Sequence, residues 1–254
     1  PQEGASLKEK DSISDETAIE PQEDEGNMSL VAHLTELRER LIKCLLSVAL
    51  GSVIAYLFIG DIMHLLTYPV GKLYYLQPAE AFFTYLKVAV AVGFLLALPV
   101  IFFHVWRFFL PALTKNERMA LSIIVPVSVA LFVLGLSFSF FFVLPAAVRF
   151  FMGFSGTELE AMFSVGHYFD FVITFVLPFG FVFELPLVIT VLGKLGMVTS
   201  TFLARHRRTV IFLSFVIAAI ITPTPDVFTQ SMLALPMIAL YEVGYRIVKH
   251  IIKG

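Results

Sequence analysis

An acidic residue within an apolar stretch is the most unusual chemical feature of the sequence. Glu184 lies in the segment 179–186 (FGFVFELP), where it is the only charged side chain. An acid at the centre of a membrane-spanning helix costs about 2.5 kcal/mol or more, so such residues usually face a cavity or a partner. Glu184 is therefore a candidate functional acid. The alternative is a protonated carboxyl that is hydrogen-bonded to a backbone carbonyl left free by a proline.

Two further acids, Glu36 and Glu117, lie beside basic residues close to apolar segments. The stretch 33–41 (HLTELRERL) has the pattern of an amphipathic helix that enters a membrane. In it Glu36 precedes Arg40 by four residues, which favours an exposed salt bridge. Glu117 lies in the short loop 115–118 (KNER), where an acid next to a helix start is stabilised by the helix dipole. From the residues alone, these structural explanations are favoured over a function.

Polar residues also mark a turn near the end of the chain. The segment 222–226 (TPTPD) contains two prolines through which a helix cannot continue. Asp226 is a good N-cap for a helix that follows. Thr222 and Gln230 lie near the ends of the two flanking apolar segments, and polar groups in lipid often hydrogen-bond between helices.

Motifs of enzymes and pumps are absent from the sequence. It has no phosphate-binding loop of the form GxxxxGK[ST], no HExxH zinc motif and no GxSxG nucleophile elbow. The six histidines are scattered, and Cys44 is the only cysteine, so no intrachain disulfide can form. We therefore expect a protein that is not an enzyme, with no catalytic residue, cofactor, metal or nucleic-acid partner.

Membrane-spanning helices must position these residues. Hydrophobic residues make up 58% of the chain and charged residues 15%, whereas about a quarter of a soluble domain is charged. A spanning helix needs about 20 apolar residues. The sequence predicts an all-α, polytopic membrane protein with six transmembrane helices, at about 41–59, 82–109, 119–144, 169–192, 210–221 and 228–241. The segments 61–78 and 145–165 are predicted to be connectors.

The last two predicted spans are short, at about 12 to 14 residues each, so neither crosses the roughly 30 Å hydrocarbon core as a regular helix. They could form a re-entrant pair or span a locally thinned bilayer. Thinning is favoured, because the charge distribution requires the chain to cross here. Prolines interrupt several spans and favour a curved, concave arrangement over a straight bundle; they are Pro99, Pro126, Pro178, Pro186 and Pro236.

The distribution of charge predicts the orientation and the domain boundary. Lys and Arg concentrate in the segments that share a side with the N-terminus, so both ends of the chain are predicted to be cytoplasmic. Nine of the 20 acidic residues lie within the first 25 positions. Such a stretch has too few apolar residues to fold. Residues 1–27 are therefore predicted to be a disordered acidic tail, and 28–254 a single membrane domain.

From about Met28 onward, the sequence resembles the TatC family, the core membrane subunit of the twin-arginine protein translocase. The resemblance rests on several motifs in order: 33–41, 105–108 (VWRF), 111–113 (PAL), 115–118, 183–186 (FELP) and 222–230 (TPTPDVFTQ). It implies a multi-pass protein of the bacterial inner membrane that binds twin-arginine signal peptides of folded cargo. It also implies single-span TatA/TatB-type partners, transport driven by the proton-motive force, and a homo-oligomer within a larger complex.

The resemblance also implies roles for individual residues. Glu36 and Glu117 match the acids of the cytoplasmic site for the paired arginines, and carboxylates accept bidentate hydrogen bonds from guanidinium groups. Residues at matching positions around that site are Arg38, Arg40, Phe108 and Leu113. By the same resemblance, Glu184 lies near the path of the signal's apolar segment, Thr222 and Gln230 receive the partner helices, and Pro69 shapes the first outer loop.

A secondary transporter or channel for small solutes is the alternative function. That class predicts inverted repeats and several paired charges within the membrane. The sequence shows no internal repeat, and Glu184 is nearly alone among the apolar segments. This alternative is therefore disfavoured.

Overall fold

The computed structural model describes residues 25–68, 70, 72–109, 118–154, 162–222, 224 and 226–252. It divides into two units, residues 1–39 and 40–254, which are described separately. The predicted acidic tail lies outside the described residues up to position 24. Helix α1 begins at Glu25, and the domain boundary predicted at residue 27 stays a prediction.

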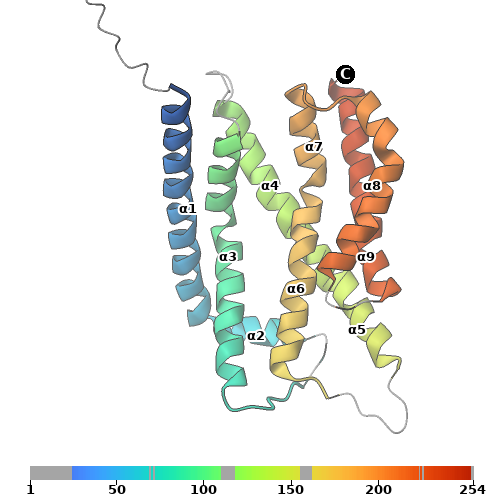
Figure 1. The fold of residues 1–254 in the computed structure, drawn as a ribbon. Helices are drawn as coiled ribbons and strands as arrows, with labels where there is room; N and C mark the ends of the chain where they lie inside the picture. The colour runs from blue at the N-terminus through green and yellow to red at the C-terminus, as the bar shows by residue number, and fades with distance from the viewer. Residues whose placement is uncertain are drawn as a thin grey trace, which may run out of the picture. The chain divides into compact units, whose positions relative to one another are not determined.

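The described residues are almost entirely helical, which confirms the predicted all-α class (Figure 1). A single bridge between Tyr74 and Ser164 is the only β-type pairing among them. The elements are α1 (Glu25–Leu57), α2 (Ile59–Thr67), α3 (Glu80–Phe109), α4 (Arg118–Phe138), the π-helical η2 (Ser139–Val143), α5 (Leu144–Met152), α6 (Val165–Phe183), α7 (Leu185–Lys194), α8 (Ser200–Ile221), α9 (Val227–Ile247) and the π-helical η3 (Val248–Ile252).

Two segments predicted to be connectors contain helices. The first holds α2, whose partly buried Ile62, Met63 and Leu66 pack on the main core. The second begins with α5, because the chain stays helical through Pro145. There the π-helical turn of η2 widens the helix, and the N–H of Leu144 bonds to the carbonyl of Ser139, five residues back. A π-type turn accommodates the hydrogen bond that a proline cannot make.

The last two crossings are shorter than the 33-residue α1 and the 30-residue α3, as predicted, but their helices exceed the predicted 12 to 14 residues. α8 has 22 residues and α9 has 21. At 1.5 Å per residue, each extends for about 30 Å. The prediction followed apolar length alone, whereas α8 begins at Ser200, capped by Thr199, and carries three arginines within the helix. The full length of α8 and α9 therefore gives no reason to expect a thinned bilayer. The remaining argument for thinning is that the apolar part of each helix is shorter than the helix.

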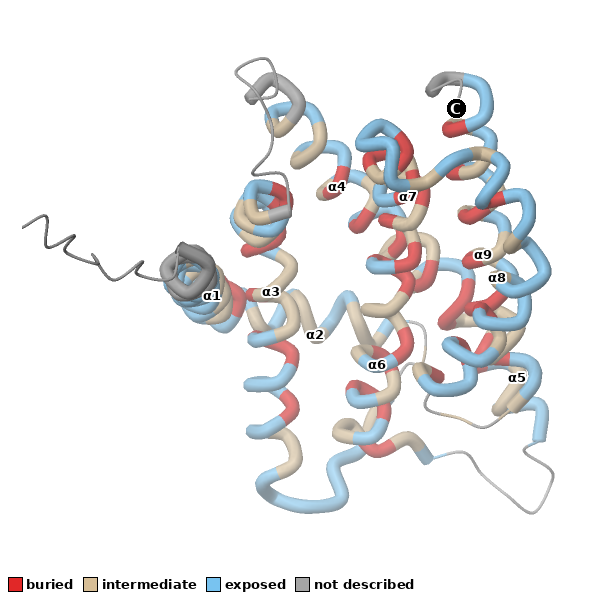
Figure 2. The backbone as a smooth tube through the Cα atoms, turned by 45° about the horizontal axis from the view of Figure 1, so that its top comes forward, coloured by how far each residue is buried: buried red, intermediate tan, exposed pale blue. Residues whose placement is uncertain are grey.

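The core of the second unit is centred on α6, which packs against α3, α4 and α9. Buried residues follow its length, shown in red in Figure 2, and include Phe169, Phe175 and Phe179. The part of α1 within this unit packs closely on α3: a Cβ added at Gly51 would lie 2.6 Å from the carbonyl oxygen of Gly93. Glycine is needed at this contact because only small residues allow two backbones to approach so closely.

Candidate functional site

Three of the predicted site residues, Glu117, Leu113 and Pro69, lie outside the described residues. Glu36 and Arg38 belong to the first unit, on α1, where both side chains are exposed. The amphipathic helix predicted over 33–41 is part of α1. The roles that the resemblance implies for these five residues remain predictions.

Arg40 joins α1 to the end of α3 within the second unit. Its Nη1 donates a hydrogen bond to the backbone carbonyl of His104 at 3.0 Å, and its guanidinium lies 5.9 Å from the ring centre of Phe108. Both contacts engage the last two turns of α3, which precede Glu117 in the sequence. Arg40 and Phe108, which the sequence predicted around one site, are therefore brought together. In this arrangement the arginine positions α1 on α3.

Glu184 lies at the junction where α6 ends and α7 begins. The helical path breaks here because Pro186 lies in the first turn of α7 and donates no backbone hydrogen bond. The side chain is 7% exposed, and it is the only charged side chain in the described part of the chain that is fully buried. The structure therefore supports the sequence observation that Glu184 is an isolated acid.

The Glu184 carboxyl has few polar contacts among the described residues. Neither carboxylate oxygen has a geometric hydrogen-bond partner among the described residues. Ser128 of α4 is the polar side chain that interacts with this carboxyl, at a geometry short of a full hydrogen bond. Ser128 also accepts a hydrogen bond from the indole N–H of Trp106 at 2.8 Å. A buried carboxyl with so few partners among the described residues costs least when it carries a proton.

The turn between α8 and α9 is built from polar side chains. Asp226 caps α9 as predicted: its Oδ1 accepts the N–H of Thr229 at 2.8 Å and its Oδ2 accepts the Thr229 hydroxyl at 2.6 Å. Partial burial raises the pKa of Asp226, but these hydrogen bonds outweigh burial and lower the pKa below its ordinary value.

Thr222 and Gln230, the predicted partner-binding residues, both bond within the chain. The Thr222 hydroxyl donates to the carbonyl of Ala218 in its own helix at 2.9 Å. The Gln230 amide donates to the carbonyl of Phe215 at 2.9 Å and so connects α9 with α8. Gln230 thus bridges two helices of this chain, and the predicted contact with a partner helix stays a prediction.

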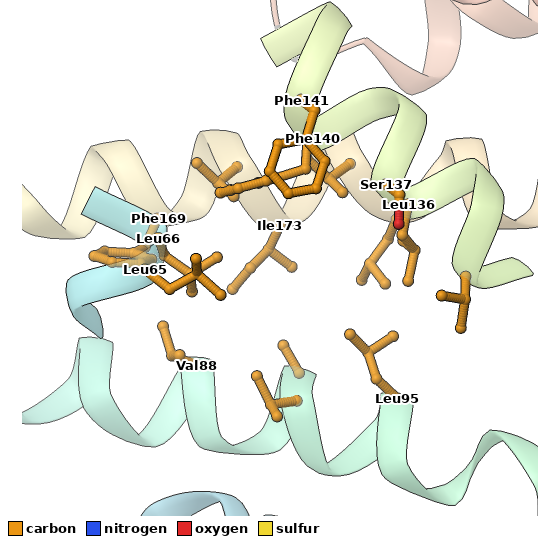
Figure 3. Close-up of a pocket in the computed structure, with 16 residues that line it drawn as sticks. Leu65, Leu66, Val88, Leu95, Leu136, Ser137, Phe140, Phe141, Phe169 and Ile173 are labelled. Carbon is orange, nitrogen blue, oxygen red and sulfur yellow. The ribbon is translucent and has the colours of Figure 1, made fainter. Parts of the chain in front are cut away.

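An apolar pocket of about 320 Å³ lies between α2, α3, α4, η2 and α6 (Figure 3). Leu65 and Leu66 close it on one side, and Phe140, Phe141 and Ile173 line the opposite walls. Ser137 is the one polar side chain among its lining residues. The lining residues include none of the predicted site residues and no charged side chain.

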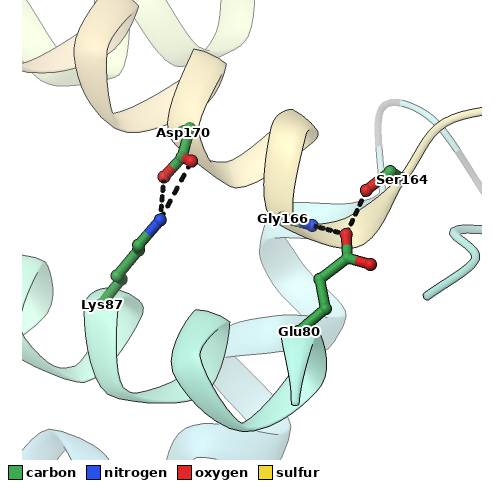
Figure 4. Close-up of polar contacts among 5 residues, drawn as sticks. All are labelled: Glu80, Lys87, Ser164, Gly166 and Asp170. Atoms are coloured by element: carbon green, nitrogen blue, oxygen red, sulfur yellow. Dashed lines mark hydrogen bonds and ion pairs between the residues drawn. The ribbon is translucent and has the colours of Figure 1, made fainter. Parts of the chain in front are cut away.

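A polar network joins the ends at which α3 and α6 begin, the side predicted to be outside (Figure 4). The Glu80 carboxylate accepts hydrogen bonds from the Ser164 hydroxyl and from the backbone N–H of Gly166 at 2.7 Å. It also accepts the N–H of Leu76 at 2.6 Å. One side chain therefore holds together the segments that lead into both helices.

Two turns further along α3 and one turn further along α6, Lys87 pairs with Asp170, with Nζ at 2.7 and 2.9 Å from the two carboxylate oxygens. At the opposite end of the unit, Arg207 of α8 pairs with Glu242 of α9. The sequence reasoning missed both pairs, because the partners are 83 and 35 residues apart and no local motif links them. Of these four residues, only Lys87 stands out in the sequence, because it is a basic residue near the start of a predicted membrane span.

The described residues hold no group of three or more His, Cys, Asp or Glu side chains that could bind a metal ion. Five helical segments are long and apolar enough to cross a membrane. Helix α8 is similar in length, but Arg205, Arg207 and Arg208 lower its apolar content. The fold and the site thus define an all-helical, multi-pass membrane protein that has a buried acid between α6 and α7.

Comparison with known proteins identifies the family. Residues 32–236 match the family model of the Sec-independent protein translocase protein (TatC). The TatC of Carboxydothermus hydrogenoformans is 39% identical over 228 residues, 88% of this chain and 94% of the relative. The TatC of Aquifex aeolicus is 42% identical over 225 residues, 85% of this chain and 93% of the relative.

A crystal structure described as the twin arginine translocase receptor TatC is 40% identical and superposes with a TM-score of 0.75. The match covers 85% of this chain and 98% of that structure. The chain belongs to the TatC family. This confirms the resemblance and the predicted six-helix membrane fold. It is a protein translocase component and not an enzyme.

Proposed function

We propose that this chain is the receptor subunit that binds twin-arginine signal peptides of folded cargo on the cytoplasmic side of a bacterial inner membrane. The observation that carries the proposal is the match, at 40% identity over 98% of its length, to a structure described as the twin arginine translocase receptor. The family model covers every site residue that the sequence predicted, because it extends from residue 32 to 236.

Glu36 and Glu117 are proposed to accept the two arginines of the signal. Two carboxylates can each receive a planar guanidinium through paired, charge-assisted hydrogen bonds, whereas a lysine ammonium cannot reproduce that geometry. The contacts of Arg40 with His104 and Phe108 support a shaping role, since they hold α1 against the last turns of α3. Arg38 and Leu113 are proposed to help shape the same site.

The lateral surface of α8 and α9 is proposed to receive the single-span TatA/TatB-type partners. Large apolar side chains are exposed along both helices, including Phe212, Ile220 and Leu235. Thr222 and Gln230 supply polar groups near the outer ends of these helices. Transport is proposed to use the proton-motive force, in a homo-oligomer within a larger complex embedded in the lipid bilayer.

Glu184 is proposed to serve as the intramembrane acid along the path of the signal's apolar segment. Its support is the burial of a carboxyl that has no full hydrogen bond among the described residues. Pro69 is proposed to shape the first outer loop, and Asp226 to hold the turn between α8 and α9.

Binding of a synthetic twin-arginine signal peptide to the purified protein tests the proposal. We expect replacement of both signal arginines by lysine to weaken binding at least about tenfold, since bidentate hydrogen bonds to carboxylates are lost. Glu36→Gln and Glu117→Gln should weaken binding of the arginine peptide and reduce its preference over the lysine peptide. Equal affinity of the two peptides for the unmodified protein would refute the receptor function.

A further inference from the structure

The Lys87–Asp170 ion pair lies at a depth where lipid headgroups meet hydrocarbon. On α3, Lys87 and Arg107 are 20 residues apart, which corresponds to about 30 Å along a helix. This equals the thickness of the hydrocarbon core. Arg107 is exposed near the cytoplasmic end of α3, so Lys87 lies at the opposite boundary. The side chains of Lys87 and Asp170 are 50% and 52% exposed, and the pair is therefore accessible from the bilayer.

An apolar groove of about 590 Å³ runs along this ion pair, lined by α3, α6 and Val48 of α1. Lys87 and Asp170 line it, and its walls continue seven residues further along both helices, to Phe94 of α3 and Leu177 of α6. The two helices both begin at the outer end, so this distance corresponds to about 10 Å toward the membrane centre. Val90 and Ile173 lie along the way. The groove thus places two opposite charges above an apolar channel.

This arrangement matches the chemistry of a phospholipid. The Lys87 ammonium has three N–H donors and uses two of them on Asp170, which leaves one for a phosphate oxygen. The Asp170 carboxylate has further lone pairs for a cationic donor. A headgroup with a phosphate and a primary ammonium complements both charges at once. A choline headgroup has no N–H to donate, and an uncharged glycerol headgroup leaves a net negative charge beside Asp170.

We propose that the α3–α6 groove is a lipid site in which the phosphate of phosphatidylethanolamine binds Lys87, its ammonium binds Asp170, and an acyl chain fills the groove. The site is separate from the residues proposed to bind signal peptides, and it does not depend on the receptor function. It concerns the outer leaflet, opposite the cytoplasmic end at which the signal is proposed to bind.

Native mass spectrometry of the purified full-length protein tests this site. The protein is titrated with phosphatidylethanolamine, phosphatidylcholine and phosphatidylglycerol that carry identical acyl chains. We expect the first lipid to bind several-fold better than the other two, because charge-assisted hydrogen bonds form at both ends of its headgroup. Equal binding of all three lipids by the unmodified protein would overturn the proposal.

Matched variants separate the two halves of the headgroup. Asp170→Asn should remove the preference for the ethanolamine headgroup while phosphatidylglycerol still binds. Lys87→Gln should weaken all three lipids, and Lys87→Arg should restore them. Arg207→Gln alters the comparable ion pair at the other membrane boundary and should leave the lipid profile unchanged. A profile that responds to neither Asp170→Asn nor Lys87→Gln would also overturn the proposal.

The acyl half of the site has its own control. Val90→Trp fills the groove and should reduce binding of all three lipids. Val100 lies on the same helix and is also exposed, but it is outside the groove. Val100→Trp should therefore leave lipid binding unchanged. Thermal melting of each variant verifies folding. If Lys87→Gln or Asp170→Asn changed copurification of a single-span protein and left lipid binding unchanged, the pair would belong to a protein interface and the lipid site would be wrong.

Discussion

Two carboxylates on the successive helices α6 and α7, Asp170 within α6 and Glu184 at the junction, differ in how the protein accommodates them. Asp170 lies one turn into α6, is half-exposed and is paired with Lys87 through both oxygens. Glu184 lies 14 residues later, is buried and makes no full hydrogen bond within the described part of the chain. At the membrane boundary an acid can keep its charge by pairing, whereas deeper in the membrane an isolated charge is costly.

The first prediction tests whether the buried acid, Glu184, destabilises the fold. Glu184→Met should stabilise the protein by about 2 kcal/mol, because it replaces a buried carboxyl that makes no full hydrogen bond among the described residues by an apolar side chain of similar size. Unfolding by SDS titration in mixed micelles measures the change. Export of a reporter cargo, measured in parallel, should fall if the acid is functional. Loss of stability in Glu184→Met would show that the carboxyl has a partner that stabilises the fold.

The second prediction concerns the one polar side chain beside Glu184. Ser128→Ala removes the acceptor of the Trp106 indole N–H and should destabilise the protein by about 1.5 kcal/mol, because it leaves a buried donor unsatisfied. Trp106 is the only tryptophan, so its emission spectrum reports the change directly. Ser128→Thr keeps the hydroxyl and serves as the control. An unchanged spectrum in Ser128→Ala would contradict the hydrogen bond.

The third prediction addresses the paired acid and has the opposite sign to the first. Asp170→Leu leaves Lys87 without its partner and should destabilise the protein by about 1 kcal/mol; the value is small because the pair is half-exposed. The double replacement Lys87→Leu with Asp170→Leu should recover most of the loss. The same SDS titration tests both variants. A stabilising effect of Asp170→Leu alone would mean that the two carboxylates do not differ as described.

The smallest expected effect belongs to Asp226, an acid outside the spans with a full set of hydrogen bonds. Asp226→Asn should cost less than about 0.5 kcal/mol at neutral pH, because asparagine is an equally good N-cap. The pKa of Asp226 is lowered in the folded protein. Its charge therefore contributes stability above the ordinary value of about 4, and that contribution is lost as the pH falls through the lowered pKa.

Melting curves from pH 6 down to pH 3 measure this contribution. The unmodified protein should lose stability with acid more steeply than Asp226→Asn, and identical pH profiles would contradict the role of its charge. The three acids thus form a series. Asp226 is stabilised by hydrogen bonds and Asp170 by an ion pair, whereas Glu184 has no ion pair and no full hydrogen bond among the described residues.

Local signals were sufficient for several features. The TPTPD segment predicted both the end of α8 and the cap on α9, because proline and aspartate act on the backbone within a few residues. Apolar length located the helices that cross the membrane. Apolar length gave the wrong helix bounds in two places. The first turns of α8 are polar but helical, and a π-type turn continues the helix past Pro145 into α5.

By itself, the sequence determined the all-helical membrane fold, the isolation of Glu184 and the membership of the TatC family, since composition, periodicity and motifs are local properties. Only the tertiary structure decided which distant side chains meet. Asp170 is paired because α3 and α6 begin side by side, whereas packing brings only the hydroxyl of Ser128 near the Glu184 carboxyl among the described residues. Packing between helices sets those distances, and no segment of the chain encodes them alone.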